Sequence, residues 1–531
     1  MKKKLLASLL AAGLCAGLSF FAVPAAAGSS QTVPPAAAGS PGFTQSLSEQ
    51  DQQIINKVVD NFKLLAMVPR PSHHERLISD LLAGWGDKQG FIVNQDKHNN
   101  IMFQVSATPG YEALPLVILQ GHMDMVCVAA EGVAYDPLKD SIRVICDDTA
   151  GTLTADGTSL GGDDGVGVSI IMLAAQGAMK HGPLRAIITT DEEDGMEGAF
   201  GISPDWLAGA SYLINLDNEA ADEVLVSTAA GDSVTATAAV IPQKPAGDTA
   251  VLLELRGLKG GHSGVEINKG RCNGLIAMAR LLKELNARGL QFGLASFDGG
   301  TAPNAIPAKA NTVIVIRSAD KEALKDIIDS YVSGLQEKYA GIEDGIRLSV
   351  TDVQGVQEVL SEKDLVNSIK FMDEIIDGVH TWSADMQGLV ESSSNLGIFN
   401  ADRNGITART YVRSSSAELE DKIVKSQQQL AQKCGFREEA VKMADAWPYK
   451  PDSRLLALTK EAYKKLNGED IKVVAVHAGL ECGTFAKLNP EMDMISIGPD
   501  LKDVHSPKET LYLSSIPKTW NLLQELLLQL K

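Results

Sequence analysis

The chain has 531 residues, of which 44% are hydrophobic and only 5% aromatic, so it has room for about two to four domains with aliphatic cores. Its formal net charge of −19 at pH 7 argues against a nucleic-acid-binding protein, because a phosphate backbone requires a basic partner surface. The acidity instead favours solubility.

The first 27 residues have the pattern of a secretory signal peptide. MKKK is a basic start, a long apolar run follows it, and Ala25–Ala27 offers an A-x-A cleavage site. A retained membrane anchor is the alternative, because the apolar run is close to spanning length. Residues 28–45, rich in Pro, Ala, Gly and Ser, are predicted to be a flexible linker. We therefore expect export to the periplasm or the extracellular space, with no membrane span after cleavage.

Residues 46–230 alternate between helical and extended patterns. Amphipathic periodicity predicts helices over 51–67 and 73–88. Short apolar runs rich in β-branched residues predict strands near 101–105, 116–119, 186–190 and 212–216. This alternation is typical of an α/β domain with a mainly parallel sheet.

Residues 231–430 have a different pattern, in which strands dominate and helices are predicted only near 274–288 and 321–339. We interpret this region as an inserted α+β domain that serves as a lid or for dimerisation, so a homodimer is one expected assembly. Residues 431–531 return to the first pattern. The sequence thus predicts a discontinuous catalytic domain, 46–230 and 431–531, with a lid domain inserted into it.

Acidic and histidine residues cluster where the strands of the catalytic domain end. His122 and Asp124 follow one apolar run, and residues two apart in an extended chain share a face. The histidine can then bind a metal while the aspartate orients its ring. Each cluster alone has a plain structural explanation, such as a helix N-cap or a solvated turn. Ligand sites of open α/β sheets assemble at this edge, however, so we expect one site from His122, Asp163 or Asp164, Glu192, Glu193, Asp217 and His505.

The types of side chain in these clusters favour Zn²⁺, with Mn²⁺ or Co²⁺ as substitutes, because they are imidazoles and carboxylates without cysteine. A shared aspartate could bridge two ions about 3.5–4 Å apart. Three ionised carboxylates leave one positive charge on two divalent ions, which a bridging hydroxide would neutralise. Glu192 would remain outside the ligand set and could take the proton from the attacking water.

The motifs that contain these residues resemble those of the M20 family of di-zinc aminopeptidases, carboxypeptidases and deacylases, and within it the aminoacyl-histidine dipeptidases. The matching segments run in the family order and span nearly the whole predicted mature chain. They are GHMDMV, SLGGDDGVG, TTDEEDGMEGAFG, LINLDNE, GGHSGVEI, NAIP, ESSSNLGI, HAGLECGTF and DVHSPKE.

The resemblance assigns a role to each residue of the expected site. It implies that one zinc is held by His122 and Asp217, and that the other is held by Glu193 and His505. Asp163 would bridge the two ions. The chain departs from the family in having Asp164 directly after Asp163, which leaves open which of the two binds.

The other roles implied by the resemblance are catalytic. Glu192 would be the general base and Asp124 would support His122, while His262 would reach over from the lid to stabilise the tetrahedral oxyanion. Asn304 and Arg413 resemble lid residues that meet the substrate, and an arginine could pair with a free C-terminal carboxylate.

Some of these residues have alternative explanations. Arg413 could instead lie on a surface strand, and His477 could either contact substrate or be structural. Cys482 beside the expected site could be a nucleophile, but no base and orienting group accompany it.

The sequence therefore predicts an exported di-zinc dipeptidase that hydrolyses small peptides, with Xaa-His dipeptides among its substrates. One alternative is an M20 amidohydrolase that cleaves N-acyl amino acids with the same machinery. Another is a non-catalytic, zinc-dependent peptide-binding protein, although such a protein would have no need for a base at Glu192.

Overall fold

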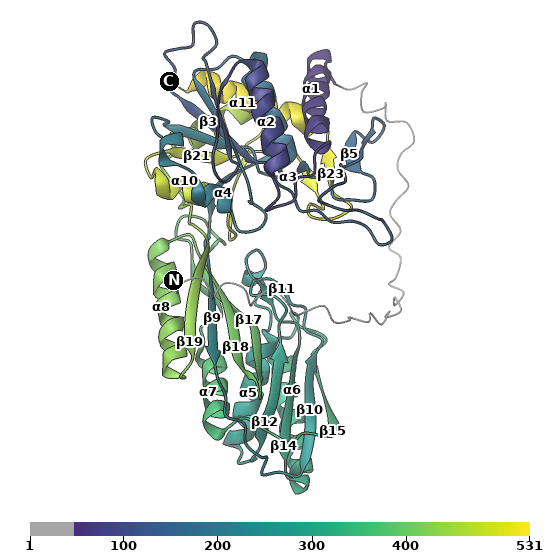
Figure 1. Ribbon diagram of the computed structural model, residues 1–531. Helices are drawn as coiled ribbons and strands as arrows, with labels where there is room; N and C mark the ends of the chain where they lie inside the picture. The colour runs from purple at the N-terminus through teal and green to yellow at the C-terminus, as the bar shows by residue number, and fades with distance from the viewer. Residues whose placement is uncertain (1–46, 531) are drawn as a thin grey trace, which may run out of the picture. The chain divides into compact units, whose positions relative to one another are not determined.

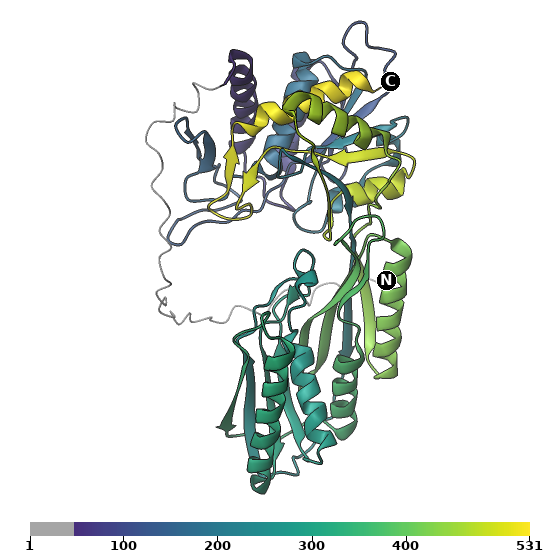
Figure 2. The same ribbon diagram turned by 180° about the vertical axis from the view of Figure 1, so that it is seen from behind.

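The computed structural model describes residues 47–530, shown from two sides in Figures 1 and 2. The predicted signal peptide and the predicted linker lie outside the described residues. Within 47–530, no helix combines the length and the apolar character that crossing a membrane requires.

An eight-stranded sheet forms the first layer of the structure, in the order β1-β2-β6-β3-β7-β21-β8-β20. Its four neighbouring central strands run parallel, as the apolar runs predicted: β6 (Leu184–Thr189), β3 (Val117–His122), β7 (Tyr212–Asn215) and β21 (Asp493–Ser496). The outer strands are β1 (Ile92–Gln95), β2 (Ile101–Val105), β8 (Glu223–Thr228) and β20 (Lys472–Val476). The prediction of an α/β domain with a mainly parallel sheet is confirmed.

Helices cover both faces of this sheet (Figure 1). The larger core lies under α1 (Glu49–Ala66), α2 (Arg76–Gln89), α3 (Gly162–Leu173), α9 (Arg454–Asn467) and α11 (Ser515–Gln529). The smaller core, on the other face, includes residues of α4 (Glu197–Gly201) and α10 (Cys482–Leu488). Helix α2 begins three residues later than predicted, because His73 has a φ of 65° and cannot belong to a right-handed helix.

A small sheet is built from two distant parts of the chain. It has the order β22-β23-β5-β4 and combines β4 (Val144–Asp147) and β5 (Thr152–Ala155) with β22 (Leu501–Lys502) and β23 (Thr510–Tyr512). The second pair flanks His505, so this sheet connects the C-terminal loop to the part of the chain just before α3.

A separate nine-stranded sheet holds most of the predicted insertion, in the order β15-β10-β14-β12-β17-β18-β9-β19, with β16 (Gly378–Trp382) paired to β17. Its first half is β10 (Thr249–Arg256), α5 (Gly274–Ala287), β12 (Gly293–Gly299), β14 (Ala310–Ile316), α6 (Lys321–Lys338) and β15 (Arg347–Val353). Its second half is β9 (Ala230–Ala238), α7 (Glu362–Glu374), β17 (Val390–Asp402), β18 (Gly405–Ser414), α8 (Ala417–Lys433) and β19 (Arg437–Ala444).

Each half is a β-α-β-β-α-β unit with the same strand order, and the first unit is inserted into the second between β9 and α7. The two units join where β12 pairs antiparallel with β17. Their helices lie together on one face of the sheet (Figure 2). Helices α5 and α6 match the two predicted helices. Helices α7 and α8 were not predicted; each buries polar side chains beside its apolar ones, Ser368 in α7 and Glu420 and Gln427 in α8.

The strand pairing indicates where the inserted domain begins and where it ends. β9 follows β8 after one residue, so the chain enters the second sheet close to residue 230. β19 still pairs with β9, and the chain returns at Trp447, which pairs with Thr228. We therefore propose that the second catalytic segment, predicted to start at 431, begins after Ala444.

Candidate active site

The parallel central strands place their carboxyl ends at one edge of the sheet. His122 is the last residue of β3, the turn Asp191–Glu193 follows β6, and Asp217 follows β7. Asp163 enters the same place from the start of α3, and His505 from the loop between β22 and β23. The structure thus brings together side chains that are up to 383 residues apart, from His122 to His505.

The two carboxylate oxygens of Asp163 face two different groups of side chains. Oδ1 lies 3.1 Å from Nε2 of His122, and that nitrogen is also 3.4 Å from Oδ1 of Asp217. Oδ2 lies 3.1 Å from Nε2 of His505, which is also 2.9 Å from Oε2 of Glu193. The five residues thus form two groups that share Asp163. Ligand atoms of His122, Asp163 and Glu193 lie within 4.8 Å of one another and could hold a metal ion.

The chemistry of these groups fits divalent cations. His122 and the three carboxylates are almost entirely buried, whereas the side chain of His505 is 46% exposed. Burial raises the pKa of Asp217 well above its usual range and also raises that of Glu193. Clustered carboxylates of this kind are costly as anions unless a cation compensates them. The imidazole and carboxylate donors suit zinc, manganese or cobalt.

Asp124 supports two parts of the site at once. Its Oδ1 lies 3.3 Å from Nδ1 of His122, on the side of the ring opposite the cluster. The same carboxylate accepts hydrogen bonds from the backbone N–H groups of Glu192 (3.1 Å) and Glu193 (3.2 Å), and from Oγ of Ser72. A single buried side chain thus orients the His122 ring and fixes the turn after β6.

Asp164 has a different environment from Asp163. Its Oδ2 accepts the backbone N–H of His122 at 3.2 Å, and only 2% of the residue is exposed. Asp163, not Asp164, lies between His122 and His505, so the geometry supports the first aspartate as the bridge.

Glu192 lies beside the cluster but outside both groups. Burial raises its pKa well above the usual range; the charge of His122 opposes that rise, and the charges of Asp217, Glu193 and Glu481 add to it. Among residues 47–530, no hydrogen bond or ion pair engages its carboxylate. A partly buried carboxylate that makes no hydrogen bond and has a raised pKa is suited to accept and return a proton.

The charge of Arg413 acts on two other predicted site residues, His262 and His477. His262 lies in β11 (Gly261–His262), which pairs with β13 (Ala305–Ile306), and Ser263 N–H donates to the carbonyl of Asn304. The exposed side chain of Asn304 makes no hydrogen bond within the described chain. Nε2 of His477 lies 2.7 Å from Oγ of Ser393. Burial, together with the charge of Arg413, lowers the pKa of His262 and brings that of His477 to about 3.

Arg413 is a buried cation without an anionic partner. Only 5% of it is exposed, and its guanidinium lies 4.3 Å from the centre of the Tyr411 ring. No carboxylate of the described chain lies within ion-pair distance of it. The structure therefore contradicts the alternative of a surface arginine. Residues 47–530 show no hydrogen bond or ion pair between His262 and the metal cluster.

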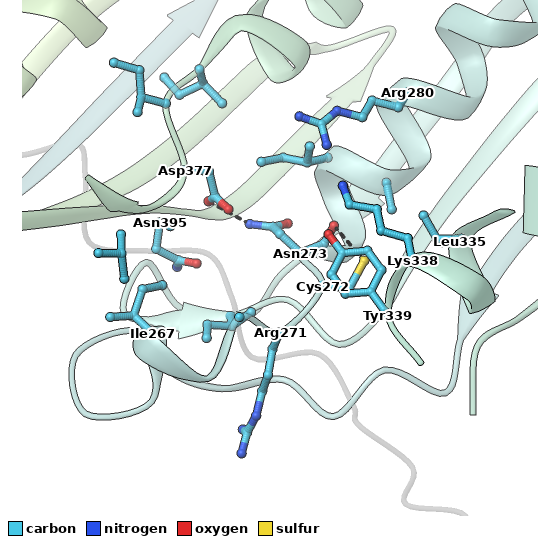
Figure 3. A pocket seen from close by; sticks show the side chains of 18 of the residues that line it. Ile267, Arg271, Cys272, Asn273, Arg280, Leu335, Lys338, Tyr339, Asp377 and Asn395 are labelled. Atoms are coloured by element: carbon cyan, nitrogen blue, oxygen red, sulfur yellow. Dashed lines mark hydrogen bonds between the residues drawn. The ribbon is translucent and has the colours of Figure 1, made fainter. Parts of the chain in front are cut away.

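Two other features are not part of this arrangement. A pocket of about 870 Å³ lies in the first β-α-β-β-α-β unit and beside β16, lined by Asn273, Arg280, Lys338, Asp377 and others (Figure 3), and it contains no predicted site residue. Cys482 is fully buried, and burial raises the pKa of its thiol well above the usual range. The thiolate needed for a cysteine nucleophile is therefore disfavoured.

The sequence patterns did not single out two buried charged residues that contact the ligand loops, Arg70 and Glu509. Arg70 has no local pattern that indicates its role. Glu509 does end the segment DVHSPKE, four residues after His505, and that proximity was the only available signal.

Comparison with known proteins gives consistent matches along the chain. A family model described as a peptidase dimerisation domain matches residues 253–343. The cytosol non-specific dipeptidase of Escherichia coli (strain K12) is 34% identical over 483 residues, which cover 91% of this chain and 99% of that protein.

Two solved structures are also similar. The aminoacylhistidine dipeptidase from Vibrio alginolyticus has a TM-score of 0.82 and 31% identity, and the match covers 92% of this chain and 98% of that one. The aminopeptidase PepT from Bacillus cereus, with a TM-score of 0.51 and 15% identity over 89% of this chain and 98% of that one, shares the fold. The dipeptidases from Escherichia coli and Vibrio alginolyticus match this chain over nearly their whole lengths. The chain therefore belongs to the M20 family of metallopeptidases, together with the cytosol non-specific and aminoacylhistidine dipeptidases.

Proposed function

We propose that this metallopeptidase is a di-zinc dipeptidase that acts outside the cytoplasm and accepts Xaa-His dipeptides. The observation that carries the proposal is the position of Asp163, whose two oxygens face two separate histidine–carboxylate groups. His122 and Asp217 would hold one ion, and Glu193 and His505 the other, with Mn²⁺ or Co²⁺ as substitutes. The names of the Escherichia coli and Vibrio alginolyticus relatives support dipeptides as the substrate class.

The reaction requires a proton to move from water to the leaving amine. Bound zinc would lower the pKa of water and polarise the scissile carbonyl. Glu192 accepts the proton of the attacking water, whose oxygen forms the new bond to the carbonyl carbon. The C–N bond then breaks, and Glu192 delivers the proton to the departing nitrogen. Asp124 keeps both Glu192 and His122 in place during these steps.

His262 is held in the tautomer that an oxyanion donor needs. Its Nδ1 accepts the backbone N–H groups of Gly264 and Val265, both at 3.3 Å, so the proton of the neutral ring lies on Nε2. Burial and the charge of Arg413 lower the pKa of the ring and keep it neutral at pH 7. A neutral ring with a free Nε2–H can donate to the developing oxyanion without adding a full charge.

Arg413 would bind the C-terminal carboxylate of the substrate. A buried guanidinium without a partner is costly, and a bidentate carboxylate would satisfy it. We also propose that the unengaged side chain of Asn304 contacts the substrate. His477 would either contact the substrate itself or, through its contact with Oγ of Ser393, hold that serine in position next to the substrate.

Replacing Arg413 should therefore weaken dipeptide binding. Arg413→Ala is expected to raise KM for a dipeptide by about 10²-fold, because truncating one partner of a buried charge pair costs about 2–5 kcal/mol. Arg413→Lys, which keeps the charge but not the planar fork, should give an intermediate KM. A C-terminally amidated dipeptide is the control, since its KM should change little. An equal rise in KM for both substrates would exclude carboxylate recognition.

Metal analysis should separate ligands from supporting residues. Asp163→Ala is expected to lower zinc occupancy outright, because it removes a ligand of both ions. Asp124→Ala should weaken zinc affinity by about 10–100-fold, as loss of a residue that orients a ligand does. Asp163→Asn and Asp164→Asn form a matched pair, and the first should bind less zinc. If Asp164→Asn is the damaging change instead, the bridge moves by one residue.

One experiment separates the proposal from its two alternatives. The pure protein, supplied with Zn²⁺, would be incubated with dipeptides, Xaa-His included, and with N-acyl amino acids. Hydrolysis of the dipeptides supports the proposal, whereas hydrolysis of N-acyl amino acids alone would indicate an amidohydrolase. Binding without hydrolysis of either class would indicate a peptide-binding protein.

Export and assembly are part of the same proposal. The name of the Escherichia coli relative places that protein in the cytosol, whereas this chain begins with the pattern of a signal peptide. Cell fractionation with N-terminal sequencing tests export, and a mature chain starting at Gly28 would support it. The match to a dimerisation domain supports a homodimer as the assembly.

A further inference from the structure

The loop that presents Asp163 is held by a single carboxylate from a distant part of the chain. Glu509 accepts four backbone hydrogen bonds: Oε2 from Leu160 (2.8 Å) and Gly161 (2.9 Å), and Oε1 from Gly162 (2.7 Å) and Asp163 (3.3 Å). Only 3% of Glu509 is exposed. Consecutive N–H groups that converge in this way form an anion-binding nest, and four donors match the lone pairs of an ionised carboxylate.

Arg70 holds the same loop from another side. Its Nη2 donates to the carbonyl of Gly161 at 2.5 Å, and its Nη1 donates to the carbonyls of Met123 (2.9 Å) and Asp124 (3.1 Å). Arg70 is 2% exposed and makes no ion pair within the described chain. It therefore connects the Asp163 loop to the segment directly after His122.

Glu509 and Arg70 together hold the Asp163 loop. Their close approach explains why residues 161 and 162 of the loop are glycines. Gly161 has a φ of 69°, and a Cβ atom there would lie 2.4 Å from Nη2 of Arg70. A Cβ atom on Gly162 would lie 2.7 Å from a methyl group of Leu501 and 3.2 Å from Oε1 of Glu509. Side chains at either position would push the loop away from the two residues that hold it.

Glu509 and Arg70 join three of the five segments that carry the expected ligands, those of His122, Asp163 and His505. Glu509 lies four residues after His505, and its own N–H donates to Ser506, so it is fixed in the same turn. It thus connects the loop of His505 to the loop of Asp163, and Arg70 connects the latter to the end of β3.

We propose that Glu509 is a positioning residue that sets the place of Asp163 between the two groups and thereby controls metal affinity, with Arg70 as its counterpart. This inference rests on the proposed metal site. Neither residue touches the substrate or the expected ions in this scheme. Both act through the backbone of the loop, so the effect should be visible in the metal site before any substrate is added.

The test compares two glutamates with the same kind of contact in the full-length protein. Glu509→Gln keeps the shape of the side chain but replaces one accepting oxygen with an NH₂ group, which faces the backbone N–H donors of the loop. Glu343→Gln is the matched control, because Glu343 is likewise buried, at 2% exposed, and accepts the backbone N–H groups of Lys259 and Cys272, away from the metal cluster. Zinc affinity would be measured by competition with a chelator, and the site geometry by the absorption spectrum of the Co²⁺-loaded protein.

Glu509→Gln is expected to lower zinc affinity by about 10–100-fold and to change the Co²⁺ spectrum, whereas Glu343→Gln should alter neither. Unchanged affinity and spectrum in Glu509→Gln, or equal changes in both variants, would overturn the inference. If Glu509→Gln does not fold, Arg70→Lys is measured instead and should lower affinity in the same way; unchanged affinity there would equally overturn the inference. If the wild-type protein binds no zinc, the proposed function fails, and that result is distinct from an unchanged Glu509→Gln.

Discussion

Glu192→Gln is expected to reduce kcat for a good dipeptide substrate by at least about 10²-fold while zinc content stays at about two per chain. The substitution preserves the shape of the side chain but removes its basicity. The carboxylate of Glu192 makes no hydrogen bond within the described chain, so its replacement breaks no structural contact. Its backbone N–H, which Asp124 holds, is unchanged by the substitution. The loss of turnover should therefore report the proton transfer alone.

The control for this prediction lies five residues further along the chain. Glu197 is an exposed residue of α4, and Glu197→Gln should leave kcat and zinc content as in the wild type. Near-normal turnover in Glu192→Gln would remove Glu192 as the base. A loss of zinc in the same variant would make Glu192 a metal ligand instead.

The sequence predicted the catalytic sheet well because each central strand contains a short apolar run, such as Val117–Leu119 in β3. The strand predicted at 101–105 is β2 without change, and the others differ by one to three residues at their ends. The positions of the expected ligands followed from the same pattern, since the carboxyl ends of parallel strands meet at one edge. That step required no knowledge of side-chain geometry.

The residue patterns by themselves do not separate Asp163 from Asp164, and only the family resemblance assigned the bridge to Asp163. Both are aspartates before the same helix, and only the direction of each carboxylate separates them. Arg70 and Glu509 were missed for a different reason. They bond almost entirely to backbone atoms of other loops, and such contacts leave no spacing or residue pattern in the chain.

The paired architecture of the second sheet was also invisible in the sequence. The two β-α-β-β-α-β units are not consecutive, because one is inserted into the other after β9. Helix α8 is predominantly polar, and two of its buried residues, Gln427 and Glu420, are polar, so the sequence shows few apolar residues on its buried face. The equivalence of the units appears only in the order of the strands.

His262→Ala is expected to leave zinc content and KM nearly unchanged while kcat falls by about 10²–10³-fold, the usual effect of removing one oxyanion donor. The ring has no contact with the metal cluster in the described chain, and its free Nε2–H is the group that the substitution removes. His262→Gln, which can still donate a hydrogen bond, should recover part of the rate. Loss of zinc in His262→Ala would make His262 a ligand and contradict the five-residue scheme.

Mixing two inactive variants, Glu192→Gln and His262→Ala, tests whether the His262 at each active site comes from the same chain or from a partner subunit. If a partner subunit supplied the histidine, mixed dimers would regain activity, because one of their sites would be intact. We expect no recovery. Strand β12 is the strand of the first unit that lies at its junction with the second unit, and it is already paired with β17 of the same chain. This edge of the first unit therefore needs no strand from a second copy. Differently tagged subunits would verify that chains exchange, and recovered activity in such mixtures would assign the histidine to the partner.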